Sequence, residues 1–164
     1  MISILAALYG TFRSPRQILD RAEISELIDR YMVGADTADD ESQDSTWYRQ
    51  IFSDSPRLSF PIGEQIGFEG LAEFHRLARL SWQATHHVSA NHIIDVDGDS
   101  ARVRVQLIGT HVSHGALGGE LLRADRFDIG AYYIGSALRT DFGWRIDMLT
   151  FTIVWESGLA TPRK

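Results

Sequence analysis

Cysteine is absent from this chain of 164 residues. Disulfides, thiolate metal sites and a cysteine nucleophile are therefore excluded, and stability must come from packing. Basic residues are also in the minority, because 16 Lys and Arg stand against 22 Asp and Glu, for a net charge of −6. They are scattered along the chain, whereas a nucleic-acid-binding protein clusters them to displace counterions. We therefore expect no nucleic-acid partner.

Long hydrophobic runs are missing as well. The apolar stretch at the N-terminus, Met1 to Tyr9, is less than half the roughly 20 residues that a membrane span needs. It also lacks the basic segment and the small-residue cleavage site of a signal peptide. We interpret it as a short lid or packing arm, with a disordered terminus as the alternative, and expect neither a signal peptide nor a membrane partner. The lack of cysteine suits the cytoplasm, which is the expected location.

The composition is otherwise that of an ordinary globular protein. Hydrophobic residues make up 44% of the chain and charged residues 23%, far from the pattern of disordered chains. A chain of this length can bury a substantial core as one domain. Because no internal repeat, linker or low-complexity tract interrupts it, we expect residues 1–164 to form a single domain.

A long amphipathic helix is predicted after Ser14-Pro15, with Asp20 as its cap. Advancing about 100° per residue places Asp36 beyond the edge of the apolar stripe, on the flank of Met32 rather than on the solvent face. A carboxylate there can look into a pocket. The stripe has the i, i+3, i+4, i+7 spacing of one buried face and consists of Ile24, Leu27, Ile28, Tyr31 and Ala35.

Shorter elements are expected next. The acidic segment Asp36 to Asp44 is interpreted as a solvated loop, and Ser45-Thr46 as the cap of a short helix. Arg57 to Phe60 is predicted to be a strand that ends at a proline. Gly70 introduces a third helix, whose apolar residues are Leu71, Phe74, Leu77, Ala78 and Leu80.

From Ala84 onward the pattern changes to the period of two that is typical of β-strands. The turn Asp97-Gly98-Asp99 joins the first two strands. After a glycine-rich loop at Gly115 to Gly119, a second hairpin is formed by about Phe127 to Arg139 and Trp144 to Trp155. Helices followed by a meander of strands, without βαβ alternation, predict an α+β fold.

Polar side chains occur where a core is expected, and these are the candidates for chemistry. Asp36 ends the first helix, imidazoles cluster between Thr85 and His92, and His111 has the parity of the apolar residues on its strand. A buried carboxylate beside an imidazole fixes the ring tautomer and favours the imidazolium form. Such a pair can therefore remove a proton from carbon near neutral pH.

The spacing of the first long strand leaves open which histidine faces the interior. His86 has the parity of the apolar residues Val88 and Ile94, whereas His87 shares its face with Asn91. If the apolar face packs on a helix, the polar face lines a cavity, and His87 and Asn91 project into it together. Otherwise His86 is the inward residue.

The chain as a whole resembles the SnoaL-like family of the nuclear transport factor 2-like superfamily. The likeness is greatest to the branch of scytalone dehydratase and hexachlorocyclohexane dehydrochlorinase, and it covers roughly residues 17–155. The residues that carry it are Glu23-Ile24, Tyr31 to Asp36, Gly67 to Gly70, Thr85 to Asn91, Asp97 to Ala101, Gly130 to Tyr133 and Arg139 to Ile146.

This resemblance implies a cone-shaped α+β barrel, in which N-terminal helices pack on a curved, mostly antiparallel sheet that encloses a pocket. By the likeness, Asp36 matches the family's acid, His87 its catalytic histidine and His111 a second pocket histidine. The choice between His86 and His87 then falls on His87. A tyrosine precedes the acid in scytalone dehydratase, where this chain has Ala35.

The resemblance also implies a function, namely a cofactor-independent, dehydratase-like lyase that acts on a small cyclic or aromatic organic molecule. His87, oriented by Asp36, would abstract the proton, and His111 or a tyrosine would protonate the departing group. Neither a metal nor another cofactor is expected. The expected substrate-binding residues are Tyr31, Tyr48, Phe60, Asn91, Tyr132 and Tyr133.

Other functions stay open from the sequence. One is a polyketide cyclase or isomerase that uses Asp36 as acid or base. Another is a non-catalytic scaffold, such as the small subunit of a ring-hydroxylating dioxygenase. Zinc held by His111 and His114 is disfavoured, because their spacing matches no established site. Since relatives commonly pair or form trimers, a homo-oligomer, either a dimer or a trimer, is expected.

Overall fold

The structure, a computed structural model, describes residues 14–37, 45–114 and 126–158. The expected N-terminal arm, most of the acidic loop after Asp36 and the glycine-rich loop at Gly115 to Gly119 lie outside these residues. The helices are α2 (Pro15–Thr37), α3 (Ser45–Ile51) and α4 (Leu71–Leu80). The strands are β1 (Phe52–Phe60), β2 (Gly63–Ile66), β3 (Ala84–Asp97), β4 (Ser100–Val112), β5 (Arg126–Thr140) and β6 (Gly143–Gly158).

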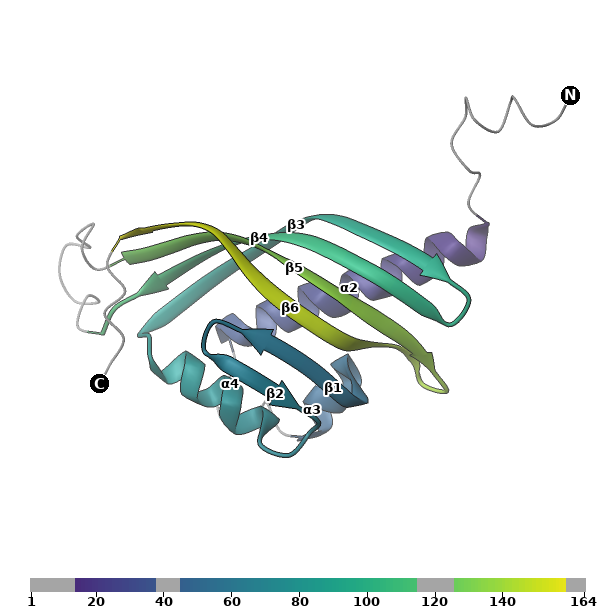
Figure 1. Cartoon of the computed structure of the whole chain (residues 1–164), viewed down its shortest axis with the longest axis horizontal. Helices are drawn as coiled ribbons and strands as arrows, with labels where there is room; N and C mark the ends of the chain where they lie inside the picture. The colour runs from purple at the N-terminus through teal and green to yellow at the C-terminus, as the bar shows by residue number, and fades with distance from the viewer. Residues whose placement is uncertain (1–13, 38–44, 115–125, 159–164) are drawn as a thin grey trace, which may run out of the picture.

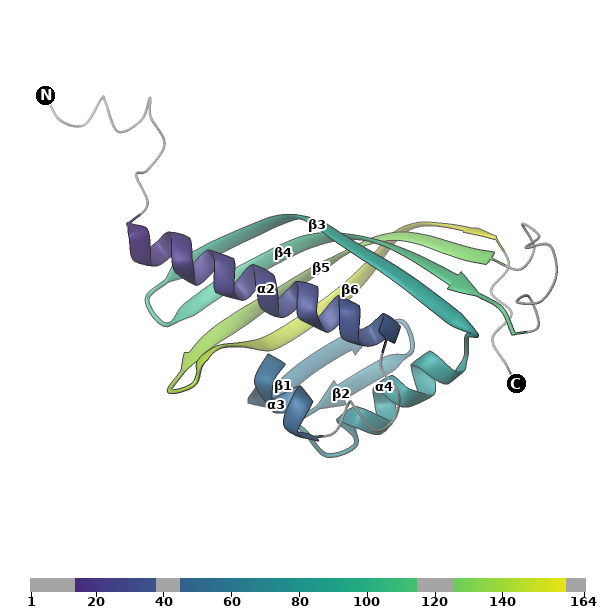
Figure 2. The same ribbon diagram turned by 180° about the vertical axis from the view of Figure 1, so that it is seen from behind.

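The six strands form one curved sheet in the order β2-β1-β6-β5-β4-β3. Neighbouring strands are antiparallel except β1 and β6, which are parallel. The long strands arch over α2, and α3 and α4 lie with the short strands on the same side (Figures 1 and 2). The predicted α+β fold is confirmed, with the qualification that the sheet is mixed and does not close into a barrel.

The core lies between α2 and the inner face of the sheet. The helix buries the predicted apolar stripe except for Ala35, which is half-buried; Ile24 and Ile28 are 0% and 2% exposed. Inward residues of β4, such as Val105 at 0%, meet this stripe because they alternate along the strand with outward residues. Full burial of one such side chain contributes about 1.5–3 kcal/mol, so the periodic residues of both elements fix how the helix sits on the sheet.

Strand β3 contains a β-bulge at the position of Asn91. Ala90 pairs with Gln106, but three residues further on Ile93 pairs with Arg104, only two residues away on β4. Asn91 has a φ of 54°, a left-handed conformation that Asn tolerates better than most residues. One extra residue is therefore inserted into β3 here.

This insertion explains the parity conflict seen in the sequence. Before the bulge, the odd-numbered His87 faces α2, and the even-numbered Val88, which is 50% exposed, faces outward. After the bulge, the even-numbered Ile94 is buried. The expectation that Asn91 projects into the pocket with His87 is wrong, because the asparagine lies in the bulge. Its amide donates a hydrogen bond to Gln106 Oε1 at 3.0 Å instead.

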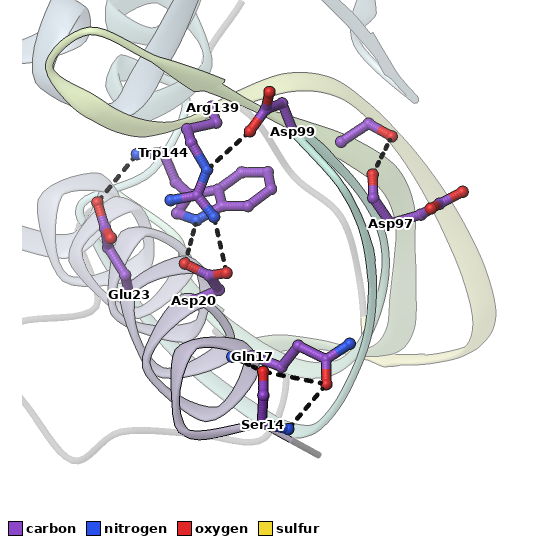
Figure 3. Close-up of polar contacts among 9 residues, drawn as sticks. Ser14, Gln17, Asp20, Glu23, Asp97, Asp99, Arg139 and Trp144 are labelled. Carbon is purple, nitrogen blue, oxygen red and sulfur yellow. Dashed lines mark hydrogen bonds and ion pairs between the residues drawn. The ribbon is translucent and has the colours of Figure 1, made fainter. Parts of the chain in front are cut away.

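A polar cluster fastens the beginning of α2 to the β5–β6 hairpin (Figure 3). Asp20 does not cap the helix, which begins at Pro15. It is buried, forms an ion pair with Arg139 Nη2 at 2.7 Å and accepts a hydrogen bond from Trp144 Nε1 at 3.2 Å. Glu23 Oε1 accepts the backbone N–H of Trp144 at 2.9 Å. The hydrogen bond from Arg139 is the main reason that the pKa of Asp20 is lowered.

The short elements differ from the prediction in their bounds. The predicted short helix is confirmed as α3, but Ser45 and Thr46 are its first residues rather than its cap, and β1 begins at Phe52 rather than Arg57. The register between β1 and β6 shifts between those two residues, and this irregularity lets Pro56 lie inside a strand. The sequence analysis missed β2, since its four residues show no alternation of apolar and polar side chains.

Candidate active site

Asp36, in the last turn of α2, holds His87 of β3 through both carboxylate oxygens. Its Oδ1 lies 2.6 Å from His87 Nδ1, and its Oδ2 accepts the backbone N–H of His87 at 2.6 Å. Thr85 Oγ1 donates a third hydrogen bond to Oδ1 at 2.8 Å. Both side chains are largely buried, with 12% of Asp36 and 14% of His87 exposed. The carboxylate therefore orients the ring and fixes the local backbone.

These contacts determine the protonation of the pair. Partial burial alone would raise the pKa of Asp36, but the hydrogen bonds from His87 and Thr85 bring it below its usual value. An ionised carboxylate can only accept, so Nδ1 of His87 carries a proton in the bond to Oδ1. In the neutral ring, Nε2 is then left with its lone pair, which is the form of a general base.

His86 lies differently. Its side chain is 76% exposed, and its Nδ1 is 4.0 Å from Asp36 Oδ2, beyond hydrogen-bonding distance. The structure therefore brings His87, and not His86, into hydrogen-bonded contact with the acid.

A cavity of about 360 Å³ opens beside this pair. His87 and Thr85 line it, and most of the remaining lining is aromatic or aliphatic. Asp36 is not among the lining residues, because it lies behind the imidazole. Of the expected substrate-binding residues, the following line the cavity: Tyr31, Tyr48, Phe60 and Tyr133.

Tyr132 does not belong to this site, and its predicted role is corrected. Tyr133 is buried and points inward, so its neighbour Tyr132 points to the opposite face of β5. There the guanidinium of Arg104 stands 4.4 Å from the centre of the Tyr132 ring.

Gly109 makes room for the imidazole. It is the partner of His87 in the β3–β4 ladder. A Cβ atom at this position would lie 3.0 Å from Cδ2 and 3.2 Å from Nε2 of His87. These distances are tighter than ordinary van der Waals contact, so a larger residue would displace the ring.

His111 lines the same cavity, next to His87. The two rings meet edge to face, with their centres 5.3 Å apart, and the ring of Trp82 lies 4.9 Å from that of His111. Burial, followed by the proximity of His87, lowers the pKa of His111 to about 4. Its Nδ1 lies 3.3 Å from the carbonyl oxygen of Phe127. His111 is thus a neutral ring whose proton is directed at the backbone, which does not suit the predicted role of proton donor.

His75 is a cavity residue that the sequence analysis missed. Its Nε2 lies 2.7 Å from the hydroxyl of Tyr31, and its Nδ1 lies 3.1 Å from the carbonyl oxygen of Leu71. Burial lowers its pKa to about 4. A signal for it was present, because His75 shares one face of α4 with Leu71 and Ala78 at i+4 and i+7 spacing.

The histidine and acidic side chains of the described residues form no metal site. Across residues 14–37, 45–114 and 126–158, no three of them are grouped closely enough to hold a metal ion. His114 Nε2 lies 3.0 Å from the carbonyl oxygen of Leu80.

None of the described helices is long and apolar enough to cross a membrane.

Comparison with known proteins defines the class to which this fold and cavity belong. The model of the SnoaL-like domain matches residues 16–150, so the chain is a member of the SnoaL-like family. None of the curated proteins matches it significantly in sequence.

Solved structures of the same fold include three of particular interest. A protein from Kribbella flavida is 24% identical, with a TM-score of 0.73, covering 86% of this chain and 95% of its own. Hexachlorocyclohexane dehydrochlorinase LinA-type3 from Novosphingobium barchaimii LL02 is 20% identical, with a TM-score of 0.67 and coverages of 90% and 95%. A scytalone dehydratase-like protein from Novosphingobium aromaticivorans is 14% identical, with a TM-score of 0.70 and coverages of 87% and 89%. At these identities the likeness shows the shared fold.

Proposed function

We propose that this protein is a cofactor-independent, dehydratase-like lyase that acts on a small cyclic or aromatic organic molecule. The observation that carries the proposal is the 2.6 Å contact between Asp36 and His87 at the wall of a largely apolar cavity. Two proteins that share the fold have names referring to elimination reactions, a dehydrochlorinase and a dehydratase-like protein, and they support the same class of chemistry.

The proposed reaction begins at Nε2 of His87. This atom takes a proton from the carbon next to the one that bears the leaving group. The C–H electron pair becomes the new double bond, and the leaving group departs with the electrons of its own bond. Asp36 stabilises the imidazolium that forms. When hydroxide leaves, the imidazolium returns the proton to it, so water is released and neutral His87 is restored.

His111 has a different part in this scheme from the one the sequence suggested. Because its Nδ1 proton is directed at the carbonyl of Phe127, its Nε2 offers a lone pair. We infer that this atom accepts a hydrogen bond from a substrate hydroxyl and orients it beside His87. His87 then serves as both base and acid.

The alternative functions have less support. An acid or base role for Asp36 alone, as in a cyclase or isomerase, requires the carboxylate to reach the substrate. Instead both of its oxygens are engaged by His87 and Thr85, and Asp36 is not among the lining residues. A non-catalytic scaffold would not require the imidazole of His87 to be oriented by a carboxylate at the cavity wall.

The test is elimination of water from a panel of cyclic β-hydroxyketones, followed by the absorbance of the conjugated product. Asp36→Asn and His87→Ala should each lower turnover by about a hundredfold or more. His86→Ala is the matched control and should retain turnover, since His86 is exposed. Unchanged turnover in Asp36→Asn would refute this mechanism. So would a variant His86→Ala that loses turnover while His87→Ala retains it.

A further inference from the structure

Tyr31 and His75 form a second polar pair in the cavity, which the proposed mechanism does not use. The Tyr31 hydroxyl lies 2.7 Å from His75 Nε2, and His75 Nδ1 lies 3.1 Å from the carbonyl oxygen of Leu71. A carbonyl oxygen only accepts, so Nδ1 must carry the ring proton. In a neutral imidazole Nε2 is then an acceptor, and the Tyr31 O–H must donate to it.

The surroundings keep His75 neutral and in place. Its ring stacks on Tyr48, with centres 5.2 Å apart and planes at 24°, and meets the edge of Phe60 at 6.2 Å. Desolvation in this aromatic environment lowers its pKa to about 4. Near neutral pH the pair therefore has one hydrogen-bonding arrangement, in which the tyrosine proton is already engaged.

This pair is placed apart from the proposed catalytic histidine. Tyr31 precedes Asp36 by five residues on α2, about 7.5 Å along the helix axis. The ring contacts also fall into two groups, because the ring of His111 packs with those of His87, Trp82 and Phe127, whereas His75 packs with Tyr48 and Phe60. Since Tyr31, His75, His87 and His111 all line one cavity, a ligand can contact both groups.

We propose that Tyr31 and His75 are a donor-recognition site that selects substrates carrying a hydroxyl group away from the reacting carbon. Because the Tyr31 proton points to His75, the Tyr31 oxygen offers only lone pairs to the cavity. An O–H or N–H group of the substrate can bind there, whereas an ether or carbonyl oxygen would meet a second acceptor. The substrate class is thus an uncharged ring compound with such a donor, and this role depends on the proposed function only in that both use the same cavity.

The experiment measures equilibrium binding of three ring compounds of nearly equal shape: indole, which has an N–H donor, indene, which has no polar group, and benzofuran, which has only an acceptor. Isothermal titration calorimetry on the full chain should show indole binding about tenfold more tightly than benzofuran, since an unmatched buried acceptor is costly. Comparable affinities for indole and benzofuran, or no binding of indole at millimolar concentration, would overturn the proposal.

Two variants distinguish recognition from a merely structural role. The double variant Tyr31→Phe/His75→Phe removes both the tyrosine oxygen and the Nε2 acceptor of His75, and the affinities of this variant for indole and benzofuran should differ by less than threefold. His75→Phe releases the Tyr31 proton, which can then donate to benzofuran, so the preference should shrink to threefold or less, or reverse. A structural role would weaken all three ligands together and leave the ratio unchanged. The exposed residue His86 provides the control, and His86→Phe should keep the wild-type ratio.

The outcome is separable from that of the elimination assay. None of the three probes can lose water, and Asp36→Asn should keep the indole preference while losing turnover. A protein with the preference but no turnover would refute the proposed function alone, and turnover without the preference would refute the donor-recognition site alone.

Discussion

Mild acid should destabilise this protein through two half-buried neutral imidazoles of the cavity. His75 and His111 have pKa values lowered to about 4 in the folded chain, against about 6.5 for an exposed histidine in the unfolded chain. As the pH falls through 6.5, these histidines bind protons in the unfolded state but not in the folded state. Their contribution to stability is therefore fully present above pH 6.5 and is lost on acidification towards pH 4. Each histidine contributes a slope of about 1.4 kcal/mol per pH unit. The two histidines together predict that the free energy of unfolding falls by about 2–3 kcal/mol for each pH unit of acidification.

Urea unfolding followed by tryptophan fluorescence, repeated at several pH values between about 7 and 5, measures this slope. The pH window separates the histidines from Asp36, whose lowered pKa affects stability only near or below its unfolded value of about 3.9. His75→Phe should reduce the slope by about half, whereas His86→Phe, at an exposed position, should leave it unchanged. A wild-type slope below about 1 kcal/mol per unit, or no change in His75→Phe, would refute the reasoning.

Three further predictions concern other parts of the fold. Asp20→Asn should lower the free energy of unfolding by about 2 kcal/mol in urea titration, because it removes the buried partner of Arg139 and leaves only the exposed carboxylate of Asp99 as counter-charge; a loss below about 1 kcal/mol would contradict this. Gly109→Ala should lower kcat about tenfold or more with little change in Tm, since the added Cβ pushes the ring of His87 out of position, and an unaltered kcat would argue against this positioning. Asn91→Val should cost about 1–2 kcal/mol and Asn91→Gly almost nothing, because only the former is strained at a positive φ; equal stability of the two variants would exclude the bulge conformation.

Much of the fold could be predicted where side-chain periodicity is uninterrupted. The buried stripe of α2 and the inward residues of β4 follow from their spacing, because both elements remain regular along their length. The bounds of β3 were predicted as well, but its inward face stayed open for the opposite reason. One inserted residue at Asn91 reverses the parity of the strand, and nothing in an alternating pattern marks where the insertion occurs.

The candidate site divides in a similar way. Asp36 could be placed near a pocket from the helical pattern, but the choice of His87 over His86 required the family likeness, since the bulge hides the true parity. His75 was overlooked because its i+4 and i+7 spacing marks only a buried face of the helix and does not by itself indicate a cavity. Its partner Tyr31, 44 residues earlier in the chain, becomes evident only when α2 and α4 are brought together. Tyr132 and Tyr133 are adjacent, so only the parity of β5 separates them.

The contact between Asp36 and the backbone of His87 has a consequence beyond chemistry. Strand β3 is the last of the sheet, and its free N–H and C=O groups could pair with a strand of another chain and cause aggregation. Side chains of α2 bind two of these groups: Asp36 accepts the N–H of His87, and Arg21 donates to the carbonyl of Ile94. The acid thus shields the edge of the sheet while it orients the imidazole. A relative that lost its activity would still need an acceptor at this position, so selection for solubility alone can keep the aspartate.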